Sequence, residues 1–424
     1  MVKANGWATG LASKWSRDAG SHLPTGASRV EQVHVLLLAI SFLFFSYIAR
    51  FGYGALVPRM IEEMGFSRAE VGIAYSVFIF MYSAFSVVSG RLFDKYGVKV
   101  VVILTFVYGL GLVLASVSSN LLALTASLAI AGLGASSTWT PMVALVSSKI
   151  PEPRRGWSTG LLEVGIRSSH GLAGFLIPLL VFVMGLRATW LVISLPLFIY
   201  CLVFYALSKS ELLRVRVKAR KEVVSYKTLL SSKEFWLVGF SYFFMSFASY
   251  IILTFLVDFL EREVGMPYAI ASAMAGIIGF VGIAGAFLLS WISDKTGRAV
   301  ILILSNAVAS LNIYLLVLSL TNETLKASLS LVVAVYGFFF GAPWPIYAAY
   351  AGDLFPSSVG TVLGLWTLMM GLGALGAPSI GGLQADLFNS YVPALLLSST
   401  AYLVAMSLMV ATAITRGRQG SPRA

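Results

Sequence analysis

The chain has 424 residues, of which 58% are apolar and only 11% are charged, and its formal net charge is +12. Ordinary soluble domains carry about 25% charged residues, so this composition excludes a soluble globular protein. The positive charge does not indicate nucleic acid, because the basic residues are scattered between apolar runs and gather in no single patch.

Residues 1–31 are mixed and polar and show no apolar periodicity, so we expect a flexible tail. Because they lack an apolar core followed by a small-residue cleavage site, we expect no signal peptide. Twelve apolar segments of about 20 residues or more follow, and this length spans a hydrocarbon core as a helix. The predicted spans are residues 33–57, 69–90, 99–118, 121–147, 157–183, 188–208, 234–258, 268–292, 299–320, 325–351, 358–383 and 391–414.

The distribution of Lys and Arg predicts the orientation of these spans. With both termini on the same side, that side holds 23 basic residues and the opposite side holds 5. Basic loops stay in the cytoplasm, so we expect a multi-pass protein of the cell membrane with both termini cytoplasmic. The basic linker, residues 209–233, is predicted to be an amphipathic strap on anionic lipid rather than a binding site.

A polar loop between spans two and three recurs 200 residues later, between spans eight and nine. The residues that define the first loop are Gly90, Asp94, Lys95 and Gly97, and those that define the second are Asp294, Lys295, Gly297 and Arg298. Glycine permits a sharp turn and a close helix approach, and the basic residues favour the cytoplasmic side. The two copies indicate one unit that occurs twice.

The two loops resemble the signature G-x-x-x-D-[RK]-x-G-[RK] of the major facilitator superfamily, and the resemblance covers spans one to twelve. It implies an all-α integral membrane fold of two pseudo-symmetric six-helix bundles, with the substrate between them near the midplane. The implied domains are a tail (1–31), two bundles (32–208 and 234–414) around the linker (209–233), and a cytoplasmic C-terminal tail (415–424). The basic residue of the family's fourth helix is missing here, since residues 121–148 contain no Lys or Arg.

Arg50 is the first candidate for substrate binding, because a charged group within a span is costly and therefore suggests function. Residues 47–58 around it resemble the first helix of the anion:cation symporter branch and related organic-anion carriers of the monocarboxylate type. In that branch the arginine faces the central cavity, where its fork of N–H groups suits a carboxylate. The structural alternative is an arginine that pairs with a neighbouring helix or reaches the outer interface.

Span five contains Glu163, Arg167 and His170. The i,i+4 spacing puts Glu163 and Arg167 on one helical face, where an ion pair would lower the insertion cost of both groups. Their role is either structural or functional, in substrate binding by Arg167 and in proton coupling by Glu163. His170 is a candidate proton carrier because imidazole titrates near neutral pH, although a hydrogen-bonded packing role is the alternative.

Aromatic and acidic residues complete the candidate set. Tyr250 stands 200 residues after Arg50, so pseudo-symmetry places it opposite the guanidinium. Trp139 and Trp344 stand beside prolines in spans four and ten and suit either a cavity wall or helix packing, and Tyr47 is a weaker candidate. Asp258 is a candidate for proton coupling or gating, but we expect it to cap a helix end.

No nucleotide-binding loop or trusted catalytic constellation is present in the sequence, so we expect neither an enzyme nor a cofactor or metal site. The prediction is a monomeric secondary transporter that moves a small organic anion, such as a carboxylate, by alternating access and together with protons or another coupling ion. One alternative is efflux of drugs or other amphipathic solutes by proton antiport. Another is a membrane sensor with the same fold that transports nothing.

Overall fold

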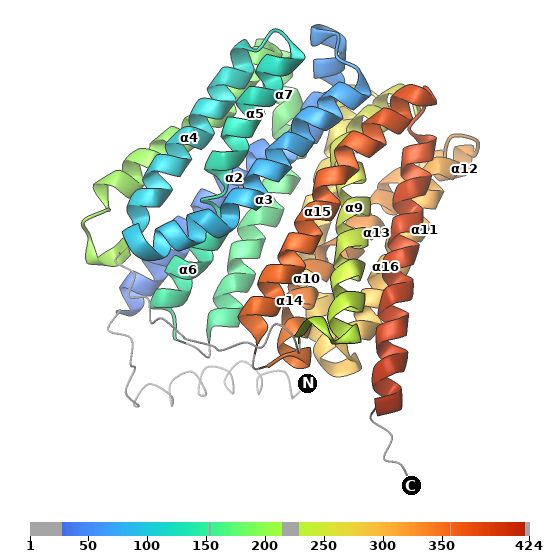
Figure 1. Cartoon of the computed structure of the whole chain (residues 1–424). Coiled ribbons are helices and arrows are strands. Elements are labelled where there is room, and N and C mark those ends of the chain that lie inside the picture. The colour runs from blue at the N-terminus through green and yellow to red at the C-terminus, as the bar shows by residue number, and fades with distance from the viewer. Residues whose placement is uncertain (1–27, 152–153, 214–228, 357, 420–424) are drawn as a thin grey trace, which may run out of the picture.

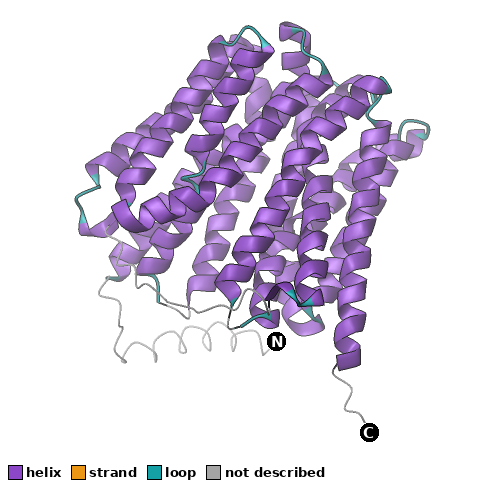
Figure 2. Cartoon of the chain, viewed as in Figure 1, coloured by secondary structure: helices purple, strands orange, loops and turns teal. Residues whose placement is uncertain are grey.

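The computed structural model describes residues 28–151, 154–213, 229–356 and 358–419. Every regular element within these ranges is a helix (Figure 2). The long helices run alongside one another across the molecule (Figure 1). This arrangement confirms the predicted all-α class.

The helices follow the predicted spans closely, with the ends shifted by a few residues. In chain order they are α2 (Arg29–Met64), α3 (Arg68–Tyr96), α4 (Val98–Val117), α5 (Leu121–Ala135), α6 (Trp139–Lys149), α7 (Arg155–Ala206), the short 3₁₀ helix η3 (Glu211–Leu213), α9 (Lys233–Arg262), α10 (Tyr268–Thr296), α11 (Arg298–Leu318), α12 (Glu323–Ala327), α13 (Leu329–Gly341), α14 (Pro343–Leu354), α15 (Val359–Leu387) and α16 (Val392–Gln419).

The ends of the bundles differ in detail from the predicted domains. Helix α2 begins at Arg29, inside the predicted tail, and α16 continues to Gln419, past the predicted end of the second bundle at residue 414. Most of the basic linker, residues 214–228, lies outside the described residues. The strap predicted there therefore stays a prediction.

Eleven helices among the described residues are long and apolar enough to cross a membrane. One of them, α7, covers predicted span 157–183 and most of span 188–208. Gly185 interrupts it between the two spans, with φ 80° and ψ 169°. A residue with a Cβ rarely adopts this conformation, and glycine adopts it freely. The eleven helices therefore correspond to the twelve predicted spans.

Spans four and ten, which contain prolines, are each divided into two helices in the structure. Between α5 and α6 the hydroxyls of Ser136, Ser137 and Thr138 donate to backbone carbonyls three residues earlier. Between α13 and α14 the break lies at Ala342, directly before Pro343, which has no N–H to donate. Non-helical backbone is tolerated at membrane depth where such groups are paired or buried in protein.

Glycines with positive φ make the internal repeat visible in the backbone. Gly65 and Gly265 have φ of 69° and 80°, and Gly97 and Gly297 have φ of 65° and 96°. Each pair is separated by 200 residues. The repeat is therefore present in the backbone conformation as well as in the sequence. It relates the first half of the chain, α2–α7, to the second half, α9–α16.

We call the end of the bundle that holds Arg29 and the end of α16 the near face, and the end that holds Gly65 and Gly265 the far face. The two halves touch closely towards the far face. A Cβ on Gly54 would overlap the Leu253 carbonyl, and one on Gly72 would overlap the Pro378 carbonyl. Small residues thus let helix backbones of the two halves meet directly.

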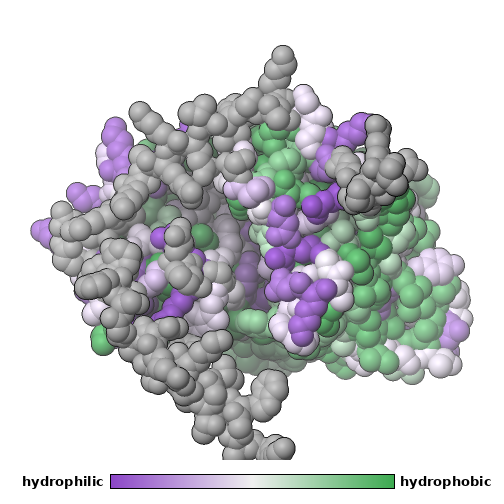
Figure 3. Space-filling view, turned by 90° about the horizontal axis from the view of Figure 1, so that it is seen from below, coloured by the Kyte–Doolittle hydropathy of each residue, from purple (hydrophilic) through white to green (hydrophobic). Residues whose placement is uncertain are grey.

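Polar groups add to this junction at the far face. The pairs are Arg59 with Glu261, Arg262 with the Pro58 carbonyl, Tyr268 with the Ala55 carbonyl, Ser76 with Ser379, and Arg68 with the Ala385 carbonyl. Between described residues, no hydrogen bond or ion pair joins the near ends of the two halves. Figure 3 looks at the near face, where hydrophilic residues lie along one side of a central hollow.

Candidate functional site

Arg50 lies between the two halves inside a group of tyrosines. Its Cζ is 4.3 Å from the ring centroid of Tyr82, 5.3 Å from that of Tyr47 and 5.9 Å from that of Tyr250. These ring faces attract the cation without neutralising it. No carboxylate of the described residues forms an ion pair with Arg50, and its buried Nε has no hydrogen-bond partner among them. Within the part of the chain that the structure describes, no ion pair compensates its positive charge.

Tyr250 stands opposite Arg50, as the 200-residue repeat predicts. Nη2 of Arg50 donates a hydrogen bond to the Tyr250 hydroxyl, which joins α2 of the first half to α9 of the second. The hydroxyl of Tyr75, in α3, donates to the Arg50 carbonyl over 3.0 Å. Side chains from three helices thus position this one residue.

Arg167 is a second guanidinium at the boundary between the halves, and its side chain is only 5% exposed. Its Nε lies 3.7 Å from Glu163 Oε2, which is longer than a normal hydrogen bond. Nη2 donates to the Gly341 carbonyl over 3.4 Å, and Cζ lies 5.1 Å from the Phe340 ring and 6.0 Å from the Trp344 ring. The predicted Glu163–Arg167 contact is therefore present but loose.

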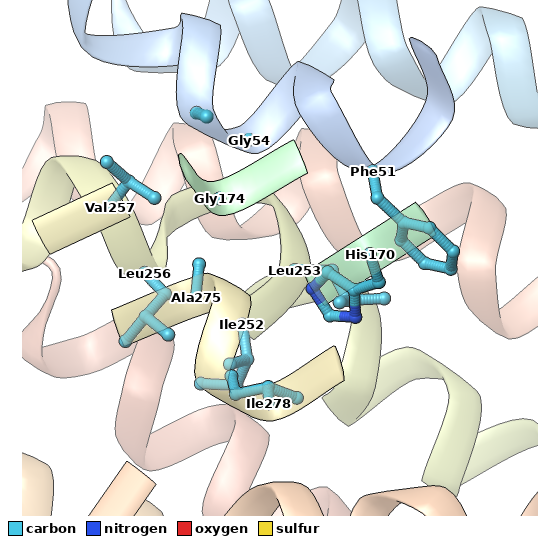
Figure 4. A pocket seen from close by; sticks show the side chains of 11 residues that line it. Phe51, Gly54, His170, Gly174, Ile252, Leu253, Leu256, Val257, Ala275 and Ile278 are labelled. Carbon is cyan, nitrogen blue, oxygen red and sulfur yellow. The ribbon is translucent and has the colours of Figure 1, made fainter. Parts of the chain in front are cut away.

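His170 is buried one turn further along α7. Its ring stacks on Phe51 with centroids 4.4 Å apart, and Phe340 meets it edge-on at 6.3 Å. Nδ1 has no hydrogen-bond partner among the described residues. His170 and Phe51 line a small cavity together with Gly54 and Gly174 (Figure 4). The alternative of a hydrogen-bonded packing role is therefore half right. His170 packs against aromatic rings, but its Nδ1 makes no hydrogen bond to a described residue.

The two tryptophans occupy equivalent places after the breaks in spans four and ten, but their surroundings differ. Trp344 lies edge-on to Tyr242 at 6.0 Å and near Arg167, so it belongs to the central group. Trp139 packs instead on the apolar cluster around α2 and α6, which includes Phe42 and Tyr47. Tyr47 connects the two environments because it also lies beside Arg50.

Asp258 is fully buried towards the far face, away from the central group. It accepts hydrogen bonds from Arg262 Nε and from the Tyr391 hydroxyl, each over 2.7 Å. The expected helix-end capping is therefore wrong, because both partners are side chains. Burial and the adjacent carboxylate raise the pKa of Tyr391 well above its usual value, so its hydroxyl remains a donor.

The signature loops turn at the near face as expected. The Gly97 N–H donates to the Phe93 carbonyl over 2.7 Å. A Cβ on Gly90 would lie 3.0 Å from Thr140, so the glycine permits the close approach of α3 and α6. Lys95 and Lys295 lie over the rings of Tyr96 and Trp291. Arg298 pairs with Asp294 over 3.0 Å and with Asp353 over 2.6 Å, and this tie holds the second loop to α14.

Sequence reasoning missed Tyr75, Tyr82 and Asp353. Tyr75 and Tyr82 are seven residues apart, which is two helical turns, and this spacing could have placed both on the face that meets Arg50. Asp353 could not be found in this way, because it meets Arg298 only through the tertiary packing of α14 against α10 and α11. The pair of Arg59 and Glu261 was missed for the same reason.

Comparison with known proteins agrees with this architecture. Residues 39–378, and in a second match residues 239–423, fit the sequence model of the Major Facilitator Superfamily. A protein of Cupriavidus necator named "Probable sulfoacetate transporter" is 22% identical over 414 residues, which cover 86% of this chain and 90% of that protein. The "Cis,cis-muconate transport protein" of Acinetobacter baylyi is 26% identical over 346 residues, which cover 76% and 80%.

A solved structure has the same fold. It is a bacterial homolog of the human lysosomal transporter Spinster, described as inward-facing and occupied. The TM-score is 0.76 at 13% identity, and the match covers 94% of this chain and 100% of that one. The overall fold is therefore shared with a sequence that has diverged widely from this one.

Proposed function

The chain belongs to the major facilitator superfamily, and from this premise we propose that it is a secondary active transporter of small organic anions, chiefly carboxylates. The uncompensated guanidinium of Arg50 carries the proposal. A central arginine in a membrane costs about 2.5–3.5 kcal/mol on insertion scales. An anion that binds there offsets this cost during transport. The names of two relatives, for sulfoacetate and muconate, support acidic cargo.

The proposed cycle is alternating access. In the described conformation the halves are joined at the far face, so the anion enters from the near face and meets Arg50 between them. The guanidinium fork then donates two parallel hydrogen bonds to the carboxylate. Rocking of the halves breaks the far-face junction and releases the anion on the other side.

Coupling, orientation and assembly complete the proposal. We place the near face in the cytoplasm of a multi-pass protein of the cell membrane, because most basic residues lie at that end. Protons are the proposed coupling ion, with Glu163, His170 and Asp258 as candidate carriers. Glu163 is the strongest candidate, because its carboxylate lies beside Arg167 and is partly exposed. The protein is proposed to work as a monomer.

Uptake into proteoliposomes tests the proposal. The full chain is reconstituted, and uptake of labelled sulfoacetate and muconate is measured with and without an imposed proton gradient. Arg50→Gln and Arg50→Ala are expected to lower uptake by about ten-fold or more, which corresponds to about 1.4 kcal/mol. Arg187→Gln removes an exposed arginine from α7 and serves as the matched control. If Arg50→Gln transports as well as the parent, the anion assignment fails.

A further inference from the structure

Arg167 has no part in the binding step proposed for Arg50, yet it is a buried cation with unused donors. A guanidinium carries five N–H groups. Among the described residues, Arg167 has one hydrogen-bond acceptor, the Gly341 carbonyl at 3.4 Å, and its Nε has none. A buried donor without a partner is costly, so this group is suited to an acceptor that the protein itself does not supply.

The two guanidinium groups belong to adjacent helices, and both contact the second half. Helices α2 and α7, which carry Arg50 and Arg167, pack against each other. Both cations reach across to the second half, Arg50 to Tyr250 and Arg167 to Phe340 and Trp344. Tyr47 and Tyr250 lie within electrostatic range of both cations. One small molecule with two acidic ends can therefore meet both.

Glu163 is the natural competitor for Arg167. Its carboxylate stays 3.7 Å from the guanidinium Nε, is 22% exposed and lies one turn towards the near face. The other titratable groups that neighbour this pair are Tyr47 of α2, Tyr242 and Tyr250 of α9, and His170 of α7. With Glu163 ionised, the three charged groups Arg50, Arg167 and Glu163 sum to one positive charge. With Glu163 protonated they sum to two.

Resting on the proposed function, we propose that Arg167 is a second anion subsite and that the cargo is a dianion, with a carboxylate or sulfonate at each end. One acidic group binds Arg50. The other displaces Glu163 from Arg167, and Glu163 takes up a proton as it leaves. Two guanidinium groups then face two anionic groups and the site is neutral. At least one proton is therefore bound with each dianion.

A matched pair of probes tests this proposal in the purified full-length protein. Trans,trans-muconate and sorbate share a six-carbon diene and differ in having two carboxylates or one. The parent is expected to bind muconate about ten-fold or more tightly than sorbate, because charge-assisted hydrogen bonds are the strong ones. Arg167→Gln should lower the muconate affinity to that of sorbate and leave sorbate within about two-fold. Arg187→Gln should change neither.

Glu163→Gln tests the proton. In the parent, muconate affinity is expected to fall by about ten-fold per pH unit, or about 100-fold between about pH 6 and about pH 8, a range in which free carboxylates remain ionised. In Glu163→Gln the muconate affinity should stay at the value for low pH throughout, because no carboxylate competes for Arg167. The pH series with Glu163→Gln and the comparison of muconate with sorbate in the parent need no Arg167 variant. They therefore test the dianion subsite even if Arg167→Gln fails to fold.

The failures of the two proposals can be told apart. If the parent binds muconate and sorbate equally, if Arg167→Gln weakens both equally or neither, or if the pH dependence persists in Glu163→Gln, the dianion subsite is overturned. Binding that depends on Arg50 would then still support the proposed function. If the parent binds neither probe, the proposed function falls and the dianion subsite falls with it.

Discussion

Arg50 is held by aromatic rings and one hydroxyl, in an arrangement that orients the cation and leaves much of it for a ligand. Tyr250 supplies its hydrogen bond from the opposite half, and Tyr75 holds its backbone carbonyl. Neither tyrosine carries a negative charge that would compete with an anion. Uncharged side chains therefore orient the Arg50 guanidinium, and its positive charge is left for the proposed anion to neutralise.

Tyr250→Phe is expected to destabilise the protein. The substitution removes the acceptor of Arg50 Nη2 inside the membrane, and hydrogen bonds to charged groups contribute about 1.5–3 kcal/mol. The temperature of heat-induced unfolding in detergent should fall, and the affinity for a bound carboxylate should fall with it. Tyr314→Phe removes an exposed hydroxyl and is the control. Equal unfolding temperatures for the two variants would contradict a positioning role for Tyr250.

Helix α7 positions Glu163, Arg167 and His170 through its contact with α10. The contact depends on glycine, because a Cβ on Gly174 would overlap the backbone of Gly276 and lie 2.6 Å from the Ser272 carbonyl. These helices belong to different halves, so their approach also sets where the side chains of α7 lie relative to the second half. Gly174 therefore helps to set the positions of Glu163 and Arg167 relative to the second half.

Gly174→Ala and Gly160→Ala should change stability in opposite directions. Both glycines lie in α7, and a Cβ on Gly160 would meet nothing within 4 Å. Alanine favours a helix by up to about 1 kcal/mol over glycine, so Gly160→Ala should raise the unfolding temperature. Gly174→Ala should lower it, because backbone must move. If both variants shift the same way in a detergent melting experiment, the close approach of α7 and α10 is not required.

The halves are joined at the far face by ion pairs, hydrogen bonds and close backbone contacts. Arg59 pairs with Glu261 of the other half and with Glu62 of its own helix, and its Cζ lies 4.5 Å from the Tyr268 ring centroid. Among the described residues, the near ends of the halves lack hydrogen bonds and ion pairs of this kind. At the scale of the whole molecule, the proposed cycle must break this junction.

Arg59→Gln should therefore favour opening at the far face. Spin labels at the exposed residues Glu63 and Leu387, in a Cys201→Ser background, report the distance between α2 and α15. The distance distribution should broaden towards larger values when the ion pair is lost. The charge swap that combines Arg59→Glu with Glu261→Arg should restore the parent distribution. An unchanged distribution in Arg59→Gln would show that other contacts hold the face.

Much of this architecture could be predicted from the sequence because a bilayer leaves the chain few choices. Apolar segments of about 20 residues must become helices there, so eleven helices correspond to the twelve spans, and Gly185 marks where two of them share one helix. The 200-residue repeat likewise predicted that Tyr250 would face Arg50. Arg50 and Arg167 stood out because a charge within a span is rare.

Other features depended on tertiary structure, because they arise between segments that the sequence does not relate. The breaks before α6 and α14, the tie between Arg298 and Asp353, and the junction of Arg59 with Glu261 require helices to be placed in three dimensions. Local sequence shows which residues are costly in a membrane. Only the packing of helices decides whether a neighbour neutralises each charge. Among the described residues, it leaves Arg50 without an ion pair and holds Arg167 Nε 3.7 Å from Glu163, beyond hydrogen-bond distance.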